Sequence, residues 1–381
     1  MSGRPDIALA EQHEEIRQAV RRFAKEQLAP NAARWDREKE FPREALKGLA
    51  AMGLSGVAIA EEWGGAGLDY TSLAIACEEI AAGDCSTATI VSVNNLVCGI
   101  LAGYGNDAQK KRFLKDLSTG KALGAFALTE PHVGSDASAI TTRAERKGSE
   151  YVLNGVKQFI TSGKNADVAV IFAVTDKAAG KKGISAFLVP TATPGYVVAR
   201  IEDKTGQRAS DTAQIVLENC KTEHLLGREG EGYRIALANL ESGRINVAAQ
   251  ATGVARAALE AAIVYARERK SMGKHLIEHQ AVNFRLADMA TQVEAARQLY
   301  LHAAQLRDAA TPCIKEASMA KLFASEMAEK VCSDAMQIHG GYGYVVDFPV
   351  ERLWRDVRVT QIYEGASDIQ RLVIGRVLEE G

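Results

Sequence analysis

One short stretch near the C-terminus has the residue types of an acid–base site. The sequence QIYEGASDIQR (361–371) places Glu364 directly before Gly365, at the start of an apolar-periodic segment. A glutamate that opens a helix commonly does no more than complement the positive end of the helix dipole. The same side chain in a dry cavity would be a general base, because burial raises the pKa of a carboxyl towards neutral pH. These residues alone leave both interpretations open.

Two stretches in the middle of the chain have residues that suit an anionic ring edge or a phosphate. FALTEPHVGSDAS (126–138) combines the hydroxyls of Thr129 and Ser135 with Gly134, which exposes backbone N–H groups. Gly-Ser-Asp is also ordinary turn chemistry. QFITSG (158–163) ends a β-rich run with an aromatic residue, an aliphatic residue and a hydroxyl, which is equally typical of core and turn.

Two further stretches lie in the C-terminal part. RERKSMGKHLIEHQ (267–280) gathers basic residues around a glycine, as a diphosphate would require, although a charged loop is usually only solvated. QIHGGYGY (337–344) breaks a helix with two adjacent glycines, which permits close approach of a ligand to the backbone. We interpret His339 as a satisfied helix-terminal histidine and not as a catalyst.

Composition and missing motifs exclude several functional classes. The 381 residues are 47% hydrophobic and 25% charged, with a formal net charge of −2, which disfavours a nucleic-acid or membrane surface as the main partner. No GxGxxG, GxSxG, P-loop or HExxH is present. The six cysteines are far apart and have no ligand spacing, so we expect reduced thiols and no metal site. No apolar run approaches the roughly 20 residues that span a bilayer. MSGRPDIALAEQHEE lacks the pattern of a targeting signal, and we expect a cytoplasmic protein.

The hydrophobic period of the sequence changes twice along the chain, and it predicts the helices and strands that position these residues. Residues 1–122 have helical periodicity, with helices expected at 8–29 (stopped by Pro30), 42–53, 71–82, 90–103 and 107–118. Residues 123–230 contain seven short β-rich runs, and Asn154-Gly155 predicts a hairpin turn between two of them. Residues 231–381 are helical again, with segments at 231–267, 277–308, 312–339 and 365–379.

These periods predict an α+β protein of three domains. The N-terminal domain (1–122) is helical, the middle domain (123–230) is an antiparallel β-barrel or sandwich, and the C-terminal domain (231–381) is a four-helix bundle. The long C-terminal helices leave faces that would pair between subunits.

The order of the motifs carries more information than each motif does. TEPHVGSD, FITSG, RERKSMG, QIHGGYGY and IYEGASDIQ, in this order on an α–β–α frame, resemble the acyl-CoA dehydrogenase family over essentially the whole chain. The stretch from IKEASMAKLFASEMA to IYEGASDIQRLVIGR is most similar to the short-chain (butyryl-CoA) and short-branched-chain branch.

The resemblance implies FAD-dependent dehydrogenation of acyl-CoA thioesters to trans-2-enoyl-CoA. Glu364 matches the base that removes the α-proton, while the β-hydride passes to flavin N5. Electrons then pass to electron-transfer flavoprotein, in fatty-acid or branched-chain amino-acid degradation. The family is typically a homotetramer with FAD shared across a subunit boundary. Substrate contacts match Ser135, Glu241, Arg244 and Gly365. Cofactor contacts match Phe126, Leu128, Thr129, Gly134, Ser135, Phe159, Ile160, Thr161, Arg269, Gln280, Gln337, Ile338, Gly340, Gly341, Ala366 and Asp368.

Four positions differ between this chain and patterns seen in the family. Ala366 replaces the usual Thr, Phe159 replaces the usual Trp, and Glu241 replaces the Asp of short-chain members. Some relatives, including the isovaleryl-specific branch, carry the base on the long helix instead, where this chain has Gly243.

Two alternative functions compete with the dehydrogenase. An acyl-CoA oxidase would pass electrons to O₂, although typical oxidases have a long C-terminal extension that this chain lacks. A non-catalytic relative would use the helical bundle only for binding or assembly. The presence of both the base and the flavin motifs disfavours it.

Overall fold

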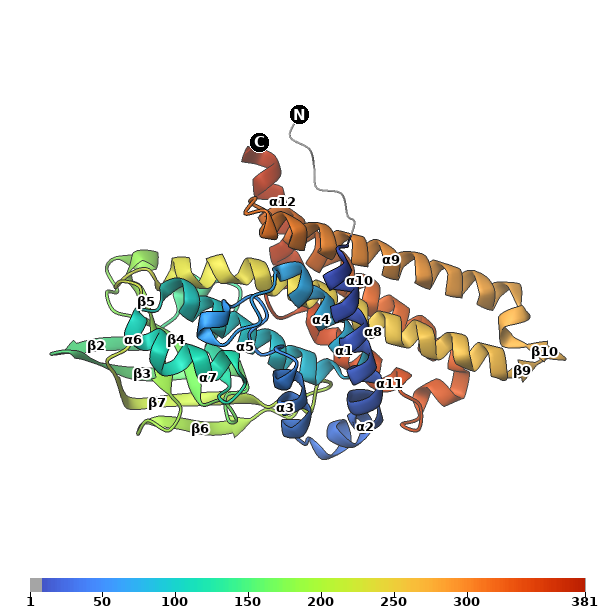
Figure 1. Cartoon of the computed structure of the whole chain (residues 1–381), viewed down its shortest axis with the longest axis horizontal. Coiled ribbons are helices and arrows are strands. Elements are labelled where there is room, and N and C mark those ends of the chain that lie inside the picture. Colours follow the sequence, from blue (N-terminus) through green and yellow to red (C-terminus); the bar gives the residue numbers. More distant parts are fainter. Residues whose placement is uncertain (1–8, 381) are drawn as a thin grey trace.

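The protein folds as helices, then a β-sheet, then helices, as Figure 1 shows for a computed structural model of the chain. The structure describes residues 9–380, so part of the N-terminal stretch that we examined for a targeting signal lies outside the described residues. The three-part fold class predicted from the sequence is confirmed. The sheet begins at Gly124 and the first helix of the C-terminal part at Gly232.

The N-terminal part differs from the prediction at Pro30, which does not end a helix. A continuous helical path runs through a π-helical turn and admits Pro30 in the first turn of α2, where the missing N–H costs little. The elements of this part are α1 (Glu11–Phe23), η1 (Ala24–Leu28), α2 (Ala29–Glu38), α3 (Arg43–Ala51), η2 (Glu61–Trp63), α4 (Tyr70–Gly83), α5 (Cys85–Tyr104), α6 (Asp107–Gln109), η3 (Lys110–Leu114) and α7 (Lys115–Ser118).

The middle part is one mixed sheet whose strands follow the order β6-β7-β3-β2-β4-β5-β8, with β1 beside β4. Most pairs are antiparallel as predicted, but β1 pairs with β4 in parallel, and so does Arg143 at the start of β2. The strands are β1 (Gly124–Ala127), β2 (Arg143–Lys147), β3 (Glu150–Thr161), β4 (Val168–Val174), β5 (Ile184–Pro190), β6 (Tyr196–Ile201), β7 (Thr212–Thr222) and β8 (Leu225–Leu226).

The hairpin predicted at Asn154-Gly155 is wrong, because both residues lie inside β3. The register of β3 against β7 shifts between Leu153 and Gly155, so the glycine serves an irregularity within the strand. A Cβ on Gly155 would lie 2.5 Å from the hydroxyl oxygen of Thr142, so a closely approaching neighbour requires glycine there. The turn lies at Gly148, after a charged strand, β2, that the hydrophobic pattern did not reveal.

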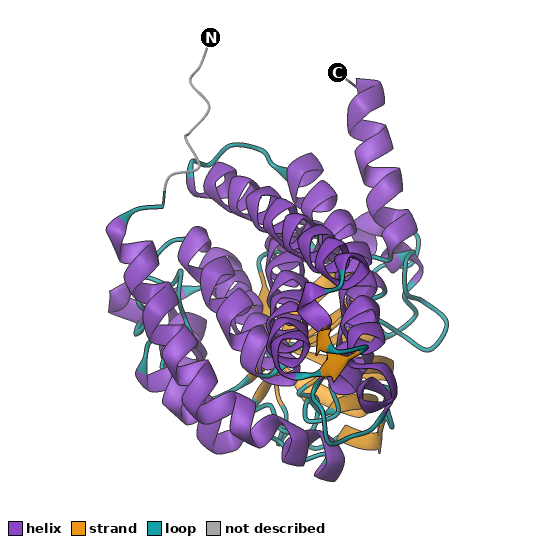
Figure 2. Cartoon of the chain, turned by 90° about the vertical axis from the view of Figure 1, so that its right-hand side faces the viewer, coloured by secondary structure: helices purple, strands orange, loops and turns teal. Residues whose placement is uncertain are grey.

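The C-terminal part is built on α8, a helix of 37 residues that contacts β5 near its start and β10 near its end. α8, α9 and α10 pack together with α4, while α12 packs on α10 and projects from the bundle (Figure 2). The elements are α8 (Gly232–Glu268), β9 (Lys270–Ser271), β10 (Lys274–His275), η6 (Leu276–Glu278), α9 (Gln280–Asp308), α10 (Ile314–His339), η7 (Gly340–Tyr344), α11 (Val350–Val357), η8 (Arg358–Gln361) and α12 (Ser367–Glu380).

A buried charge network joins α4 to the bundle. The Glu78 carboxylate accepts hydrogen bonds from Arg256 Nε at 3.0 Å and from Arg297 Nη2 at 2.8 Å. Burial alone would raise the pKa of Glu78, but the guanidinium groups of Arg297 and Arg256 hold this pKa at about 2. The carboxylate therefore stays charged and fixes α4 against α8 and α9.

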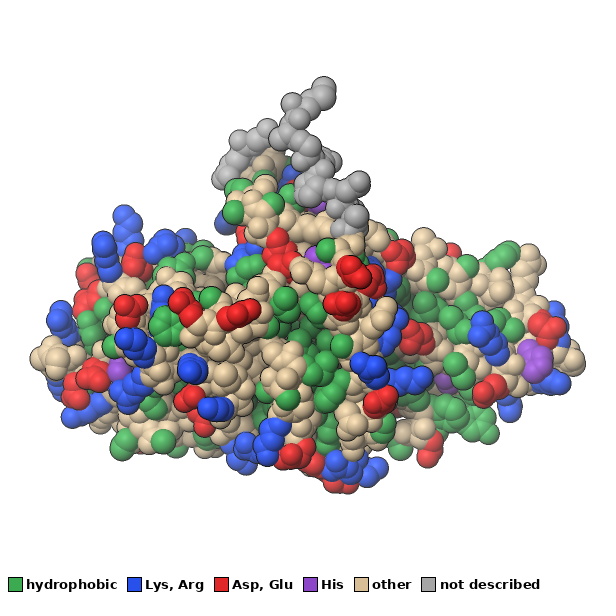
Figure 3. All heavy atoms as spheres, in the orientation of Figure 1, with side chains coloured by type: hydrophobic (Ala, Val, Ile, Leu, Met, Phe, Trp, Pro, Cys, Tyr) green, Lys and Arg blue, Asp and Glu red, His purple; other side chains and the backbone are tan. Residues whose placement is uncertain are grey.

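Two helices, α5 and α8, are long and apolar enough to cross a membrane by length and composition alone, contrary to the expectation from the sequence. Their most apolar windows are 78% and 67% buried inside the protein, which identifies them as core helices. The surface in Figure 3 carries interspersed positive and negative side chains.

The close contact between α4 and α8 predicts that one added methyl group at Gly253 strongly destabilises the fold. A Cβ on Gly253 would lie 2.1 Å from the carbonyl oxygen of Glu78, whereas a Cβ on Gly103 in α5 would meet nothing within 4 Å. We expect Gly253→Ala to lower the free energy of unfolding by about 2–3 kcal/mol through overpacking. The control Gly103→Ala should raise it by up to about 1 kcal/mol. Urea midpoints measure both, and equal midpoints would contradict the tight contact.

Candidate active site

Glu364 lies in the segment between η8 and α12, and its carboxyl group abuts α8. A Cβ built on Gly243 would lie 2.7 Å from Glu364 Oε2 and 3.0 Å from its Cδ, so only glycine leaves room for this carboxyl. Oε2 is buried and has no hydrogen-bond partner. Loss of water raises the pKa of Glu364 to about 7, against the opposing effect of Arg244 and Lys321. The interpretation of Glu364 as a solvated helix-opening charge therefore does not fit.

Two buried cations face this carboxyl from different helices. Arg244 on α8 donates from Nη1 to Ser318 Oγ at 3.1 Å, and its Nε has no partner. Lys321 on α10 donates from Nζ to the Gly365 carbonyl oxygen at 2.7 Å. Burial lowers the pKa of Lys321 to about 8, while the Glu364 charge opposes that shift.

The backbone around the carboxyl is held in an uncommon conformation. Glu364 and Gly365 have φ angles of 54° and 88°. Gln370 Nε2 donates to both of their carbonyl oxygens, at 3.1 Å and 2.8 Å. Among residues 9–380, the Glu364 N–H finds no protein acceptor, so it is available to a ligand.

Glu241, the nearest rival carboxylate in the sequence, is already paired. Its Oε1 accepts a hydrogen bond from Arg307 Nη1 at 2.8 Å, and the Arg307 guanidinium lies 4.2 Å from the centre of the Tyr70 ring. Glu241 and Arg244 are therefore both in place near Gly243, but Glu241 is committed to a pair between α8 and α9.

The cofactor residues predicted in the middle domain divide by exposure. Phe159 is 62% exposed with a φ of 59°, and Gly134 and Ser135 are also exposed. Ile160 is buried in the sheet core and Leu128 is buried against α5, so a ligand could reach mainly their backbone. The remaining three, Phe126, Thr129 and Thr161, are partly buried.

A buried ion pair that the sequence did not reveal supports this segment. Lys157 Nζ donates to Glu130 Oε1 at 2.9 Å, and both side chains are almost fully buried. Glu130 also accepts from the backbone N–H groups of Thr141 and Thr142, at 2.7 Å and 2.9 Å. The acidic residue of TEPHVGSD therefore braces the loop, while the hydroxyls and glycine remain open to a ligand.

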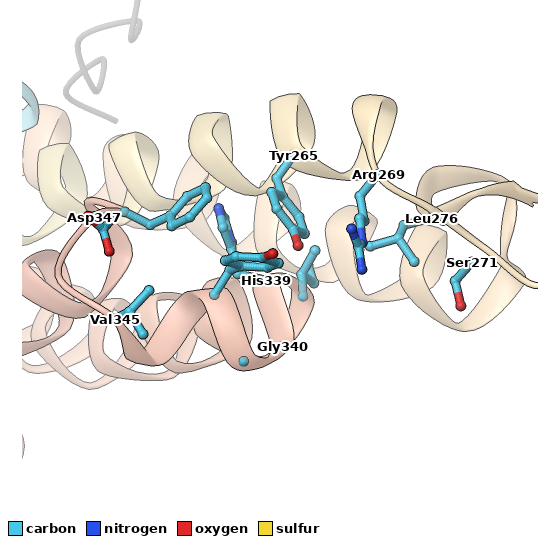
Figure 4. Close-up of a pocket in the computed structure, with 12 residues that line it drawn as sticks. Tyr265, Arg269, Ser271, Leu276, His339, Gly340, Val345 and Asp347 are labelled. Carbon is cyan, nitrogen blue, oxygen red and sulfur yellow. The ribbon is translucent and has the colours of Figure 1, made fainter.

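A second group of predicted residues lies at the far end of α8. Arg269, Ile338, Gly340 and Gly341 line a cavity of about 680 Å³. Tyr265 reaches from α8 towards His339, while Arg269, just after α8, lies beside Leu276 (Figure 4). The Tyr265 and His339 rings stack with centroids 4.3 Å apart, and the Arg269 guanidinium lies 5.7 Å from the Tyr342 centroid. Gln280 and Gln337 are exposed in the adjoining helix ends. His339 Nδ1 lies 2.8 Å from the Ala335 carbonyl oxygen, as expected of a satisfied histidine.

One chain does not bring the Arg269 group next to Glu364. Gly243, against which the Glu364 carboxyl packs, lies 26 residues before Arg269, the residue that follows α8, and this is roughly 39 Å at 1.5 Å per residue. Ala366, two residues after Glu364, is partly buried, and Asp368 is exposed near Arg371. Each group alone is therefore an incomplete site.

The two incomplete sites fit the ends of a flavin dinucleotide. At one end lie the exposed Phe159 ring and the open Gly134, where a Cβ would meet nothing. At the other end lie Arg269 and two glycines, Gly340 and Gly341, that are equally open. Within residues 9–380, no cluster of three or more metal-ligating side chains occurs.

Lys321, Gln370 and the pair Glu130–Lys157 were not found from the sequence. The signal for Lys321 was present, because it continues an apolar stripe of α10 with Ala317, Ala320 and Ala324, all buried. A charged residue within an apolar stripe means either that the helical face was assigned wrongly or that the charge is buried for a function. Hydrophobic periodicity alone does not distinguish these two cases.

Three family models match consecutive parts of the chain. They are the acyl-CoA dehydrogenase N-terminal domain at residues 10–121, the middle domain at 125–220 and the C-terminal domain at 230–379. The short-chain specific acyl-CoA dehydrogenase, mitochondrial, of Rattus norvegicus is 47% identical over 97% of this chain and 90% of its own.

Solved structures agree with these matches. Butyryl-CoA dehydrogenase from Megasphaera elsdenii superposes with a TM-score of 0.96 at 40% identity, covering 98% of this chain and 100% of that one. A chain from work on the electron-transferring flavoprotein of Acidaminococcus fermentans gives a TM-score of 0.97 at 44% identity, covering 99% and 100%. The prolyl acyl carrier protein oxidase AnaB gives 0.93 at 32% identity, covering 97% and 99%.

The buried carboxyl predicts a stability that falls with rising pH. A carboxyl whose pKa is raised on folding destabilises the fold above its ordinary pKa, and the penalty grows until pH passes the folded value of about 7. Glu364→Gln should therefore raise the free energy of unfolding by up to about 3 kcal/mol near pH 8 and by almost nothing near pH 4. Urea unfolding at both pH values measures the difference. A gain that is equal at both would mean that Glu364 is not the titrating group.

Proposed function

The chain belongs to the acyl-CoA dehydrogenase family, and from this premise we propose that Glu364 is the base that removes the α-proton of a short-chain acyl-CoA. Membership makes the protein an FAD-dependent acyl-CoA dehydrogenase. The observation that carries the proposal is the Glu364 carboxyl, which is buried against Gly243 with Oε2 unpartnered.

The local geometry suits proton abstraction next to a thioester carbonyl. Oε2 makes no hydrogen bond to protein and can accept a proton, and a pKa of about 7 matches the base to neutral pH. The free N–H of Glu364 can donate to the thioester oxygen, which stabilises the negative charge that develops there. FAD, when bound, supplies the acceptor for the hydride that leaves the β-carbon.

Similarity supports a short acyl chain, straight or short-branched. The rat relative is named short-chain specific, and the Megasphaera elsdenii structure is a butyryl-CoA dehydrogenase. The match to a chain from work on an electron-transferring flavoprotein supports such a flavoprotein as the electron acceptor. We place the reaction in fatty-acid or branched-chain amino-acid degradation on the same ground.

The incomplete sites support a homo-oligomer that shares its flavin sites, with a tetramer as the family form. The Arg269 group lies too far from Glu364 to contact the same flavin within one chain, so a second copy would supply it. Large apolar side chains on the bundle helices remain exposed, including Val264 on α8 at 54%, Phe284 on α9 at 58% and Phe323 on α10 at 38%, as faces that pair between subunits would be.

The oxidase alternative keeps one specific observation in its favour. AnaB, an oxidase, matches this chain over 99% of its own length, so an oxidase can have this fold without a long C-terminal extension of its own. Anaerobic reduction of the flavin, followed by stopped-flow mixing with O₂ or with an electron-transfer flavoprotein, separates the two functions. A protein that binds no FAD would instead support a non-catalytic role.

The base assignment is tested by Glu364→Gln. The substitution keeps the side-chain volume and the backbone N–H but removes the proton acceptor. We expect the variant to retain FAD and bind butyryl-CoA, while the rate of flavin bleaching falls by at least about 10³-fold. Bleaching at a rate near that of the wild type would exclude Glu364 as the base.

The contact between Glu364 and Gly243 predicts a transfer of the base. A glutamate at 243 would extend into the volume that the Glu364 carboxyl now fills. Glu364→Gly should be almost inactive, and adding Gly243→Glu should restore part of the flavin reduction. Recovery should stay incomplete, because a displaced base loses effective molarity.

The matched control is Gly243→Glu with Glu364 retained. Two carboxyls would then compete for one space, so this variant should be less stable than either the wild type or the double variant. No recovery in a folded, FAD-loaded double variant would show that residue 243 does not reach the substrate carbon.

The shared flavin site predicts that cofactor and assembly are lost together. Arg269→Ala should lower both FAD content and the oligomer fraction, because a ligand stabilises the state that builds its site. Arg267→Ala, two residues away on the same helix end, is the control. Light scattering with absorbance at the flavin band measures both quantities, and a monomer with full FAD content would contradict the shared site.

A further inference from the structure

Lys321 is a buried ammonium group with few partners. It lies on α10 with its side chain fully buried. Its hydrogen bond within residues 9–380 runs from Nζ to the Gly365 carbonyl oxygen at 2.7 Å. An ammonium has three donors, and burying a charge with so few partners is costly. Packing alone would be served better by methionine or leucine.

The site that Lys321 faces contains the Glu364 carboxyl. Lys321 approaches from α10 and Arg244 from α8, and these are the two cations that oppose the raised pKa of Glu364. The other titratable groups nearby are engaged elsewhere. The Tyr363 hydroxyl donates to Gln250 at 2.7 Å, Glu241 pairs with Arg307, and Glu326 pairs with Arg371 on the surface.

Lys321 also holds the backbone that aims the carboxyl. Glu364 and Gly365 are two successive residues with positive φ, a conformation that a non-glycine residue keeps only when its surroundings impose it. The Gly365 carbonyl oxygen accepts hydrogen bonds from Lys321 Nζ and from Gln370 Nε2. Loss of one of these two hydrogen bonds would let the Gly365 peptide group rotate. The rotation would carry Glu364 Oε2 away from Gly243.

We propose that Lys321 is a positioning residue for the base: it fixes the Glu364–Gly365 turn through the Gly365 carbonyl and stabilises the carboxylate by its charge. This inference rests on the proposed role of Glu364. It assigns to Lys321 no contact with substrate. The effect should therefore appear in the ionisation of Glu364 and in the rate of flavin reduction, and not in substrate binding.

The direction of the effect follows from the charge. A nearby cation favours the ionised form of a carboxyl, so its removal raises the pKa of Glu364. At neutral pH less of the base is then ionised, and flavin reduction slows. At higher pH the base ionises again, and only the loss caused by the loosened turn remains.

The test compares Lys321→Met, Lys321→Gln and Lys321→Arg in the FAD-loaded enzyme. The first removes charge and donor, the second removes only the charge, and the third keeps both. Infrared difference titration follows the protonated carboxyl of Glu364, assigned by its absence in Glu364→Gln. Stopped-flow reduction by butyryl-CoA gives the rate across pH and the apparent substrate affinity.

We expect Lys321→Met to raise the Glu364 pKa by about 1 unit or more and to slow reduction at neutral pH by about tenfold or more. Apparent affinity should fall by a smaller factor than the rate, since Lys321 itself makes no contact with substrate. Lys321→Arg should restore the pKa. Lys321→Gln should show the raised pKa with a smaller loss of rate at high pH, and it replaces Lys321→Met if that variant does not fold.

Lys330→Met on the exposed side of the same helix is the control and should match the wild type. A wild-type pKa and rate in Lys321→Met, or in Lys321→Gln if only that variant folds, would overturn the inference. Failure of the base assignment is distinguishable, because flavin reduction would then persist in Glu364→Gln whatever residue stands at 321.

Discussion

A carboxyl group whose oxygen is removed from water must find partners or give up its charge, and the Glu364 carboxyl does neither completely. Its Oε2 has no hydrogen bond, its pKa is raised to about 7, and two buried cations keep the ionised form accessible. A base with a free lone pair and a pKa near neutrality is what abstraction of a weakly acidic α-proton requires. The partly unpaired carboxyl is therefore energetically unfavourable, and the rest of the fold has to hold it in place.

Elements from all three parts of the chain hold it. A closed ring of buried hydrogen bonds passes from the Tyr363 hydroxyl to Gln250 on α8, then to Thr89 on α5, to Gln207 beside the sheet, and back to Tyr363. Tyr363 precedes the base directly, so the ring fixes one side of the turn while Lys321 and Gln370 fix the other. The N-terminal helix α5 and the segment between β6 and β7 thus support the Glu364 turn from outside the C-terminal part.

The architecture was predictable from the sequence because period and turn residues act locally. Long helices such as α8 and α10 and strands such as β4 can be recognised from the spacing of their apolar residues. The prediction failed at two places. Asn154-Gly155 forms an irregularity inside β3 where a hairpin turn was predicted, and Pro30 follows a π-helical turn where the end of a helix was predicted. Motif order pointed to Glu364 as the candidate base, but Lys321 and the Glu130–Lys157 pair could not be found, because burial of a charge depends on which helices and strands meet in space.

The central claim is that the buried Glu364 carboxyl removes the α-proton in the step that reduces the flavin. The most direct measurement is the wild-type rate of anaerobic flavin reduction as a function of pH, with butyryl-CoA deuterated or not at the α-carbon. The account predicts a rate that rises through one ionisation close to pH 7 and a substantial slowing by α-deuteration at every pH. A rate that is independent of pH, with no α-deuterium effect, would contradict it.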